Sequence, residues 1–134
     1  MHRASDDHFG DLAPWQTVAV TVYFTLKSFP PPGEPFLNFE NLIRALDIMS
    51  EEDGLHIVPG RVTVSTAGIV PKIYEFAQLE RRPNLAISLS SPYDVQRDEI
   101  MPINKRWDIN ELMTAAKAFE KTLKRGERFT FEYV

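Results

Sequence analysis

Apolar and polar residues follow two different periods along the chain, and each period predicts one kind of element. Four stretches rich in β-branched and aromatic residues predict strands, at 17–26, 61–66, 84–90 and 129–134. Between them apolar residues recur every three or four positions, which is typical of helices with one buried face. These helices are predicted at 36–49, 70–79 and 94–101 and from Asp108 onward. Strands separated by helices indicate an α/β fold with about four parallel strands and crossover helices.

The last helix has the clearest boundaries. Asp108 with Glu111 three positions later fits a capping box, and Gly126 is predicted to end the helix. Its predicted inward face consists of Ile109, Leu112, Met113, Ala116, Phe119 and Leu123. The first helix is predicted to bury Phe39, Leu42, Ile43, Leu46 and Met49.

Length limits what this α/β fold can be. The chain has 134 residues, of which 43% are hydrophobic, and this suits one globular domain with a core. A complete eight-stranded β/α barrel needs about 250 residues. We therefore expect a fragment that holds only part of a barrel. The formal net charge of -4 gives no overall attraction to nucleic acid, so RNA binding would need a local basic patch.

Cysteine is absent from the sequence. This excludes disulfides, zinc thiolate sites and an iron–sulfur cluster ligated by these residues. The longest apolar run, at 17–26, is too short to span a bilayer, and the first fifteen residues carry acids where a signal peptide carries basic residues. We expect a cytoplasmic protein with no membrane partner.

Candidate binding residues follow the predicted strands. In parallel α/β folds ligands bind at the carboxyl ends of the strands, and those ends carry Gly33 and Glu34, then Ser65 and Thr66, then Ser88 and Ser90. One carboxylate with several hydroxyls suits a ligand that carries an amine, a carboxylate and a ribose. Each element alone is also explained locally, because Gly33 to Pro35 fits a turn that starts a helix and serines are common at strand ends.

Four blocks together carry a more specific signal: GEPFLNFENLIRALDIMSEEDGL, RVTVSTAGIVP, NLAISLSSPYDVQRDEIMPINK and RFTFEYV. In this order and spacing they resemble the RlmN-type radical S-adenosylmethionine (SAM) enzymes, which methylate C2 of adenine in 23S rRNA and tRNA. The resemblance runs over residues 33–134 and leaves 1–32 as a non-matching N-terminal segment. It implies a partial radical SAM β/α barrel core domain.

The resemblance also implies a cofactor site. Gly33 and Glu34 fall on the motif that holds the SAM amino group, Ser65 falls on a strand-end SAM contact, and Ser88, Leu89 and Ser90 fall on a third contacting stretch. The family commonly has histidine at the position of Ser90. Ahead of Gly33 this chain has prolines 30–32, where the family has a flexible turn rich in glycine and methionine.

The chemistry that the resemblance implies is incomplete in this chain. Members of the family bind a four-iron four-sulfur (4Fe-4S) cluster through a CxxxCxxC loop and use two further cysteines in methyl transfer. Because the chain has no cysteine, we expect it to be catalytically inactive by itself. It would then be a fragment of a SAM-dependent methyltransferase that acts on 23S rRNA and tRNA.

Other polar residues have simpler interpretations. His2, His8 and His56 lack metal-ligand spacing. Asp94, Arg97, Asp98 and Glu99 are interpreted as a solvated charged face of one short helix. Lys117, Lys121, Lys124, Arg125 and Arg128 complement the dipole at a helix end, and Lys105 with Arg106 are the better candidates for RNA contact.

Two further hypotheses stay open. One is a non-catalytic α/β binding module that keeps part of a SAM-binding rim, and the other is an unrelated small α/β enzyme that uses Glu34 as an acid or base. A CxxxCxxC loop encoded in another reading frame upstream of Gly33 would indicate a truncated or frameshifted methyltransferase gene. If the chain is a fragment of a β/α barrel, the strand at 129–134 lacks the neighbour that it has in the full barrel. Its unpaired edge then predicts self-association or marginal stability.

Overall fold

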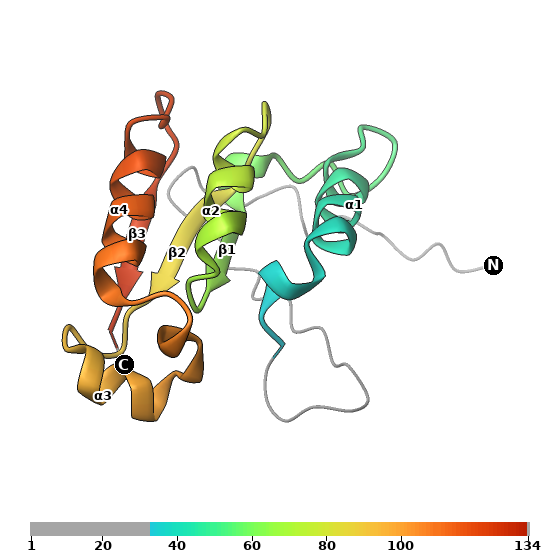
Figure 1. Ribbon diagram of the computed structural model, residues 1–134. Helices are drawn as coiled ribbons and strands as arrows, with labels where there is room; N and C mark the ends of the chain where they lie inside the picture. Colours follow the sequence, from blue (N-terminus) through green and yellow to red (C-terminus); the bar gives the residue numbers. More distant parts are fainter. Residues whose placement is uncertain (1–32, 134) are drawn as a thin grey trace.

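The computed structural model describes residues 33–133, and Figure 1 shows how they are arranged. The strand predicted at 17–26, together with His2, His8 and Val134, lies outside the described residues. Helices and strands alternate in the order α1 (Phe39–Ser50), β1 (Thr63–Thr66), α2 (Val70–Ala77), β2 (Asn84–Ser88), α3 (Asp94–Ile100), α4 (Ile109–Glu120) and β3 (Phe129–Glu132). Three 3₁₀ turns, η1 (Pro35–Asn38), η2 (Pro59–Arg61) and η3 (Pro102–Lys105), complete these elements.

The three strands form one parallel sheet in the order β1-β2-β3. Helix follows both β1 and β2, so the chain returns to the same end of the sheet before the next strand begins, and this confirms the predicted α/β class. Figure 1 shows α2 and α4 side by side over one face of the sheet. The register pairs Ser65 with Ala86 and Ser88 with Glu132.

The hydrophobic core lies between the sheet and these two helices. Its fully buried members include Leu85 and Ile87 of β2, Ile73 and Phe76 of α2, and Leu112 and Phe119 of α4. Phe76 and Phe119 stack with ring centroids 6.1 Å apart, and Phe36 lies 5.4 Å from Phe76. Because each large apolar side chain contributes about 1.5–3 kcal/mol when fully buried, this layer supplies most of the stabilisation.

The amino-terminal helix begins later than the sequence predicts. Pro35 opens the 3₁₀ turn η1, and Asn38 has φ -120° and ψ 47°, which interrupts helical geometry before α1 begins at Phe39. Within α1 only Leu42 is fully buried, while Phe39 and Leu46 pack partly against the core. Helix α1 therefore packs at the margin of the core rather than over its centre.

Helix α4 ends earlier than predicted. It begins with the predicted capping box, since the Asp108 carboxylate accepts from the Glu111 amide and the Glu111 carboxylate accepts from the Asp108 amide. It stops at Glu120, because the Thr122 hydroxyl donates to the Phe119 carbonyl and the chain turns. The buried face holds Leu112, Ala116 and Phe119 as predicted and also Ala115, while Ile109, Met113 and Leu123 are only half-buried.

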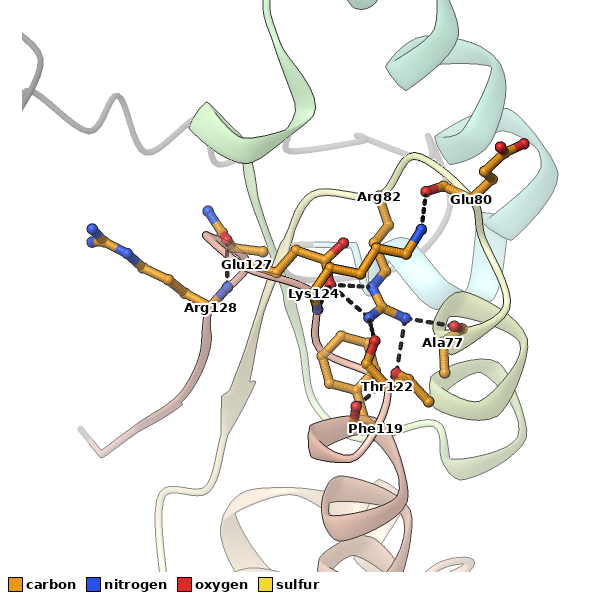
Figure 2. Close-up of polar contacts among 9 residues, drawn as sticks. Ala77, Glu80, Arg82, Phe119, Thr122, Lys124, Glu127 and Arg128 are labelled. Atoms are coloured by element: carbon orange, nitrogen blue, oxygen red, sulfur yellow. Dashed lines mark hydrogen bonds and ion pairs between the residues drawn. The ribbon is translucent and has the colours of Figure 1, made fainter.

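Arg82 ties the helices together at the amino ends of the strands (Figure 2). Its Nε and Nη2 atoms donate to Oε2 of Glu127 at 3.2 and 2.7 Å, and Nη1 donates to Thr122 Oγ1 and the Ala77 carbonyl. The guanidinium carbon lies 4.7 Å from the centre of the Phe119 ring. Burial raises the pKa of the Glu127 carboxyl, but hydrogen bonds from the Lys124 amide and from Arg82 outweigh burial and hold that pKa below its ordinary value.

Candidate functional site at the carboxyl ends of the strands

The two faces of the sheet differ in chemistry. Side chains alternate between faces along a strand, and the face under α2 and α4 is apolar, with Val64, Leu85 and Ile87 buried. The register places small and polar residues on the opposite face, namely Thr63, Ser65, Ala86, Ser88, Thr130 and Glu132. Among residues 33–133 no helix covers this polar face (Figure 1), and it reaches the carboxyl ends of the parallel strands, where this fold class binds ligands.

Three side chains meet on this polar face and form what we call the serine–glutamate cluster, Ser65, Ser88 and Glu132. The Ser65 hydroxyl donates to Oε2 of Glu132 at 2.9 Å, and the Ser88 hydroxyl reaches the same oxygen at 3.5 Å. The two serine Oγ atoms lie 3.4 Å apart. The structure therefore brings together two of the residues that the sequence singled out, Ser65 and Ser88.

Glu34 lies at the same end of the sheet but binds a different part of β1. Its Oε1 accepts hydrogen bonds from Thr66 Oγ1 at 2.6 Å and from the Phe36 amide at 3.1 Å. Its Oε2 accepts from the Ala67 amide at 2.5 Å. Thr66 is buried on the helix side of the sheet, so within the described residues no hydrogen bond joins Glu34 to the serine–glutamate cluster.

Arg97 lies at the carboxyl ends of β1 and β2, and it is buried and fully inaccessible to solvent. Its guanidinium donates to the carbonyls of Ala67, Ser88 and Leu89 and to Oδ1 of Asn104. The carbonyl acceptors follow or end β1 and β2, so a single side chain holds both strand ends. Burial lowers the pKa of the Arg97 guanidinium, while the charges of Asp94 and Asp98 act in the opposite direction.

The interpretation of α3 as a solvated charged face is therefore wrong for Arg97. Asn104, itself buried, donates to both Asp94 Oδ1 and Asp98 Oδ1, and in this way it places two carboxylates close to the buried cation. A buried arginine is stable only when its donors find acceptors. The loop carbonyls and Asn104 supply acceptors that helix periodicity does not reveal.

The remaining predicted site residues lie around Arg97 and Glu34. Leu89 packs partly against the core, and its carbonyl accepts from Arg97. Ser90 has φ +57°, a left-handed conformation that non-glycine residues adopt at a cost of the order of 1 kcal/mol or more, and it turns the chain away from β2. Gly33 is exposed and directly precedes Glu34.

Comparison with known proteins relates this site to a family. No family model matches the chain. The probable dual-specificity RNA methyltransferase RlmN of Koribacter versatilis is 51% identical over 106 residues, which are 79% of this chain and 30% of that protein. The protein of the same name from Clostridioides difficile is 48% identical over 101 residues, or 75% of this chain and 29% of its own length. About three quarters of this chain thus match one segment of RlmN proteins.

A solved structure agrees with this assignment. The crystal structure of a radical SAM methyltransferase from Sphaerobacter thermophilus superposes with a TM-score of 0.71 at 40% identity. The match covers 76% of this chain and 29% of that one. The chain thus spans about three tenths of the length of the RlmN proteins that it matches, and its parallel sheet with crossover helices corresponds to part of a larger fold.

Within the segment that matches RlmN proteins the structure adds two residues to those predicted from sequence. Glu132 joins the serine–glutamate cluster, and Arg97 holds the strand ends beneath it. Arg97 carries a weak signal in the sequence, because a lone basic residue among acids on a short helix fits a buried ion-pair network as well as a solvated face. Glu132 carries none, because only the pairing of β3 with β2 places it beside Ser88.

The basic residues that the sequence analysis considered for RNA contact lie in two places. Lys121, Lys124, Arg125 and Arg128 follow α4 toward β3 and therefore lie at the amino ends of the strands, where the Lys124 ammonium donates to the Glu80 carbonyl (Figure 2). Lys105 and Arg106 are exposed, at and just after η3, which follows α3. Only this second group belongs to the same end of the sheet as the candidate site.

The described residues contain neither a metal cluster nor a membrane-spanning helix. Across 33–133 no three His, Cys, Asp or Glu side chains gather in a way that could hold a metal ion. His56, the histidine of this range, is exposed. None of the helices in the same range is both long enough and apolar enough to cross a bilayer.

Proposed function

We propose that residues 33–134 are part of the SAM-binding core of an RlmN-type methyltransferase that transfers a methyl group to C2 of adenine in RNA. The observation that carries this proposal is the identity of 46–51% to proteins named RNA methyltransferases over about three quarters of the chain. The radical SAM methyltransferase with the same fold supports it. Residues 1–32 form a separate segment in this proposal.

Glu34 is proposed to receive the SAM ammonium, with Gly33 beside it. A carboxylate has about four lone-pair sites, two on each oxygen. From the described residues the Glu34 Oε1 atom accepts two hydrogen bonds and Oε2 accepts one, so among these residues one site on Oε2 has no donor. A charge-assisted bond from an ammonium fits that site, while the Thr66 and Ala67 donors fix the direction in which it points.

Ser65, Ser88, Leu89 and Ser90 are proposed to contact the rest of SAM. The two serine hydroxyls lie on the sheet face opposite α2 and α4, and the backbone of Leu89 and Ser90 borders the same end. The serine at position 90 is shorter than the histidine that is common in the family, so this contact would be made by a smaller group or by the backbone.

A 4Fe-4S cluster does not fit the residues of this chain. Its ligands are cysteine thiolates, and the 134 residues contain none. The chain by itself is therefore expected to bind no cluster and to transfer no methyl group. Anaerobic reconstitution with iron and sulfide checks this, and stoichiometric iron bound by the purified chain would contradict it.

The proposed RNA substrates are 23S rRNA and tRNA, and the proposed location is the cytoplasm, where both occur. Lys105 and Arg106 are the proposed contacts to the phosphate backbone, because they are exposed on the same end of the molecule as the SAM-binding residues. The total charge of -4 makes such a local contact necessary.

A chimera tests the proposed activity. Residues 33–134 replace the matching segment of the Koribacter versatilis RlmN, which keeps its own flanking sequence. We expect the chimera to methylate RNA, because about half of the exchanged residues are identical. The chimera with Glu34→Ala is expected to lose SAM binding, and Glu40→Ala, an exposed glutamate of α1, serves as its control. A folded chimera that binds SAM but methylates no RNA would contradict the proposed activity.

A non-catalytic binding module is the second candidate, and the absence of cysteine favours it. In that case the isolated chain binds SAM through the rim alone. We expect a dissociation constant no tighter than about 1 mM, which corresponds to about -4 kcal/mol. Calorimetry measures it, and micromolar affinity would mean that the rim is more complete than the described contacts indicate.

We also propose that the isolated chain self-associates through β3. Among the described residues β3 pairs only with β2, so one edge of it carries unpaired backbone groups. Phe131 and Tyr133, in and just after this strand, are exposed aromatic residues. Unpaired strand edges with apolar side chains are the usual route to association.

A further inference from the structure

The end of the sheet opposite the candidate site carries a concentration of positive charge. An exposed arginine precedes each described strand: Arg61 ends η2 before β1, Arg81 lies in the loop before β2, and Arg128 directly precedes β3. The connection from α4 to β3 adds three exposed cations, Lys121, Lys124 and Arg125. We call these six residues the amino-end basic surface. The net charge of -4 for the whole chain conceals this local excess.

No acidic side chain of residues 33–133 forms a salt bridge with this surface. Glu127 is already bound, because its Oε2 accepts from the Arg82 guanidinium at 2.7 Å and from the Lys124 amide at 2.8 Å. The Lys124 ammonium donates to the Glu80 carbonyl at 2.9 Å (Figure 2), and an ammonium has three donors. Exposed acids at this end, Glu80 and Glu120 among them, are fewer than the cations around the α4–β3 connection.

The backbone that carries these cations has a defined conformation. Gly126, at φ +93°, permits a turn in which the Glu127 amide donates to the Lys124 carbonyl at 3.1 Å. Asn84, buried at the start of β2, donates to the Gly60 carbonyl at 2.9 Å and accepts from the Arg128 amide at 2.8 Å. Asn84 thereby joins the segment before β1 to the segment before β3. Backbone that is already ordered lowers the entropic cost of binding a partner.

A helix dipole explains only part of this charge. Cations stabilise a helix when they lie in or next to its last turn, and α4 ends at Glu120, so the effect reaches Lys121 and at most Lys124. Arg61 and Arg128 lie at the entries of strands, and sheets have only small net dipoles. The dipole interpretation made from the sequence therefore does not account for the whole surface.

The composition of the surface indicates which anionic partner it fits. Proteins bind single-stranded nucleic acid with cations and with aromatic side chains on which bases stack. None of the exposed aromatic residues of the described range lies in a connection that enters a strand; they are Tyr74, Tyr93, Phe131 and Tyr133. Double-stranded RNA is recognised mostly through its phosphates and its shape, which requires cations and no stacking platform.

We propose that the amino-end basic surface binds the phosphate backbone of a double-stranded arm of RNA. The inference rests on the proposed function for the identity of the partner, because that function makes RNA the substrate. It adds a contact away from the reacting adenine. Strand β2 has five residues and is therefore about 17 Å long at roughly 3.3 Å per residue. An RNA arm longer than this strand can reach both ends of the sheet.

Fluorescence anisotropy of the full 134-residue chain with a labelled RNA duplex of about 16 base pairs tests the inference at several salt concentrations. The test variant, Arg125→Gln with Arg128→Gln, removes two exposed charges and no side-chain hydrogen bond seen among 33–133. We expect about tenfold weaker binding at low salt and a salt slope of log K that falls by about two, because each phosphate contact contributes roughly one. Arg44→Gln with Lys117→Gln, an equal charge loss at exposed helix positions, should change neither value.

A third pair, Lys105→Gln with Arg106→Gln, separates this inference from the proposed function. Weaker duplex binding in that pair alone would overturn the amino-end surface, while the RNA contact proposed at the other end stands. Equal affinity for single-stranded RNA, or higher affinity for polyglutamate, would also overturn the assignment to double-stranded RNA. A wild-type chain that binds no duplex would overturn the inference, and methylation by the chimera would still decide the proposed function. Circular dichroism of each variant establishes that it is folded.

Discussion

Glu34 acts first on the backbone of its own protein. Its carboxylate accepts from the Phe36 amide, the Thr66 hydroxyl and the Ala67 amide, so it joins η1 to the end of β1. Glu34→Gln replaces one acceptor oxygen by an NH₂ donor that faces donors. We expect a loss of about 1–3 kcal/mol in the free energy of unfolding. Urea unfolding measures it, with Glu40→Gln as the exposed control, and equal stability of the two variants would contradict the bracing role.

Arg97 is the most connected side chain at this end of the molecule, and it gives the second prediction. Arg97→Met would leave three loop carbonyls and the Asn104 side chain without their donor. We expect about 3–5 kcal/mol of destabilisation, the range for breaking a buried charged network. Arg97→Lys should restore little, because an ammonium lacks the planar fork that serves four acceptors. The control is Arg44→Met at an exposed position of α1. A small loss of stability in both variants would contradict the structural role of Arg97.

Among the elements, α4 depends on the cap at its first turn. Asp108→Ala removes the acceptor for the Glu111 amide, and we expect about 1 kcal/mol of lost stability. Asp108→Ser keeps a capping oxygen and should recover most of it. Thermal unfolding followed by circular dichroism compares the three proteins. Equal melting temperatures of the alanine and serine variants would contradict a contribution of the capping oxygen to stability.

The α3–η3 unit should respond to acid. Hydrogen bonds from Asn104 and from the Ile109 amide hold the pKa of the Asp94 carboxyl below its ordinary value, against a smaller effect of burial. A group with a lowered folded pKa stabilises the protein above its unfolded pKa, about 3.9 for aspartate, and this stabilisation is lost as pH falls through the lower folded value.

The Asp94→Asn variant isolates that response. The stability difference between wild type and variant should be constant near neutral pH and should shrink as the pH falls below about 4. Urea unfolding at several pH values measures it, with Glu99→Gln, an exposed carboxylate of α3, as the control. A difference that grows on acidification would have the wrong sign for this mechanism.

How well the sequence predicts a feature depends on how far apart the interacting residues are along the chain. The helices and strands between residues 33 and 133 follow from local periodicity, and the cap at Asp108 follows from a spacing of three residues. Ser65 and Ser88 could be placed together because parallel strands end at one edge. The contacts of Glu132 and Arg97 could not be predicted. Glu132 meets Ser65, 67 positions away, only through the register of the sheet, and Arg97 binds backbone carbonyls, which helix periodicity does not reveal, one of them 30 positions away.

At the scale of the whole molecule, the exposed edge of β3 predicts association. Phe131→Lys adds a charge where another strand would pair, so we expect the apparent mass in sedimentation velocity to fall toward that of the monomer at high concentration. Tyr74→Lys, an equally exposed aromatic on α2, controls for solubility in general. A wild-type chain that is monomeric at all concentrations, with a sharp melting transition, would contradict the prediction.

The two buried arginines have a consequence for how this sheet can evolve. Arg82 binds only the helix ends and the loop before β3, whereas Arg97 binds the strand ends that carry the candidate site. Substitutions around Arg82 are therefore expected to change thermal stability without changing a direct contact of the candidate site. Substitutions around Arg97 are expected to affect both stability and the candidate site. A directed-evolution library that aims at higher thermal stability should therefore vary residues around Arg82. A library that aims at altered ligand recognition should vary residues around Arg97.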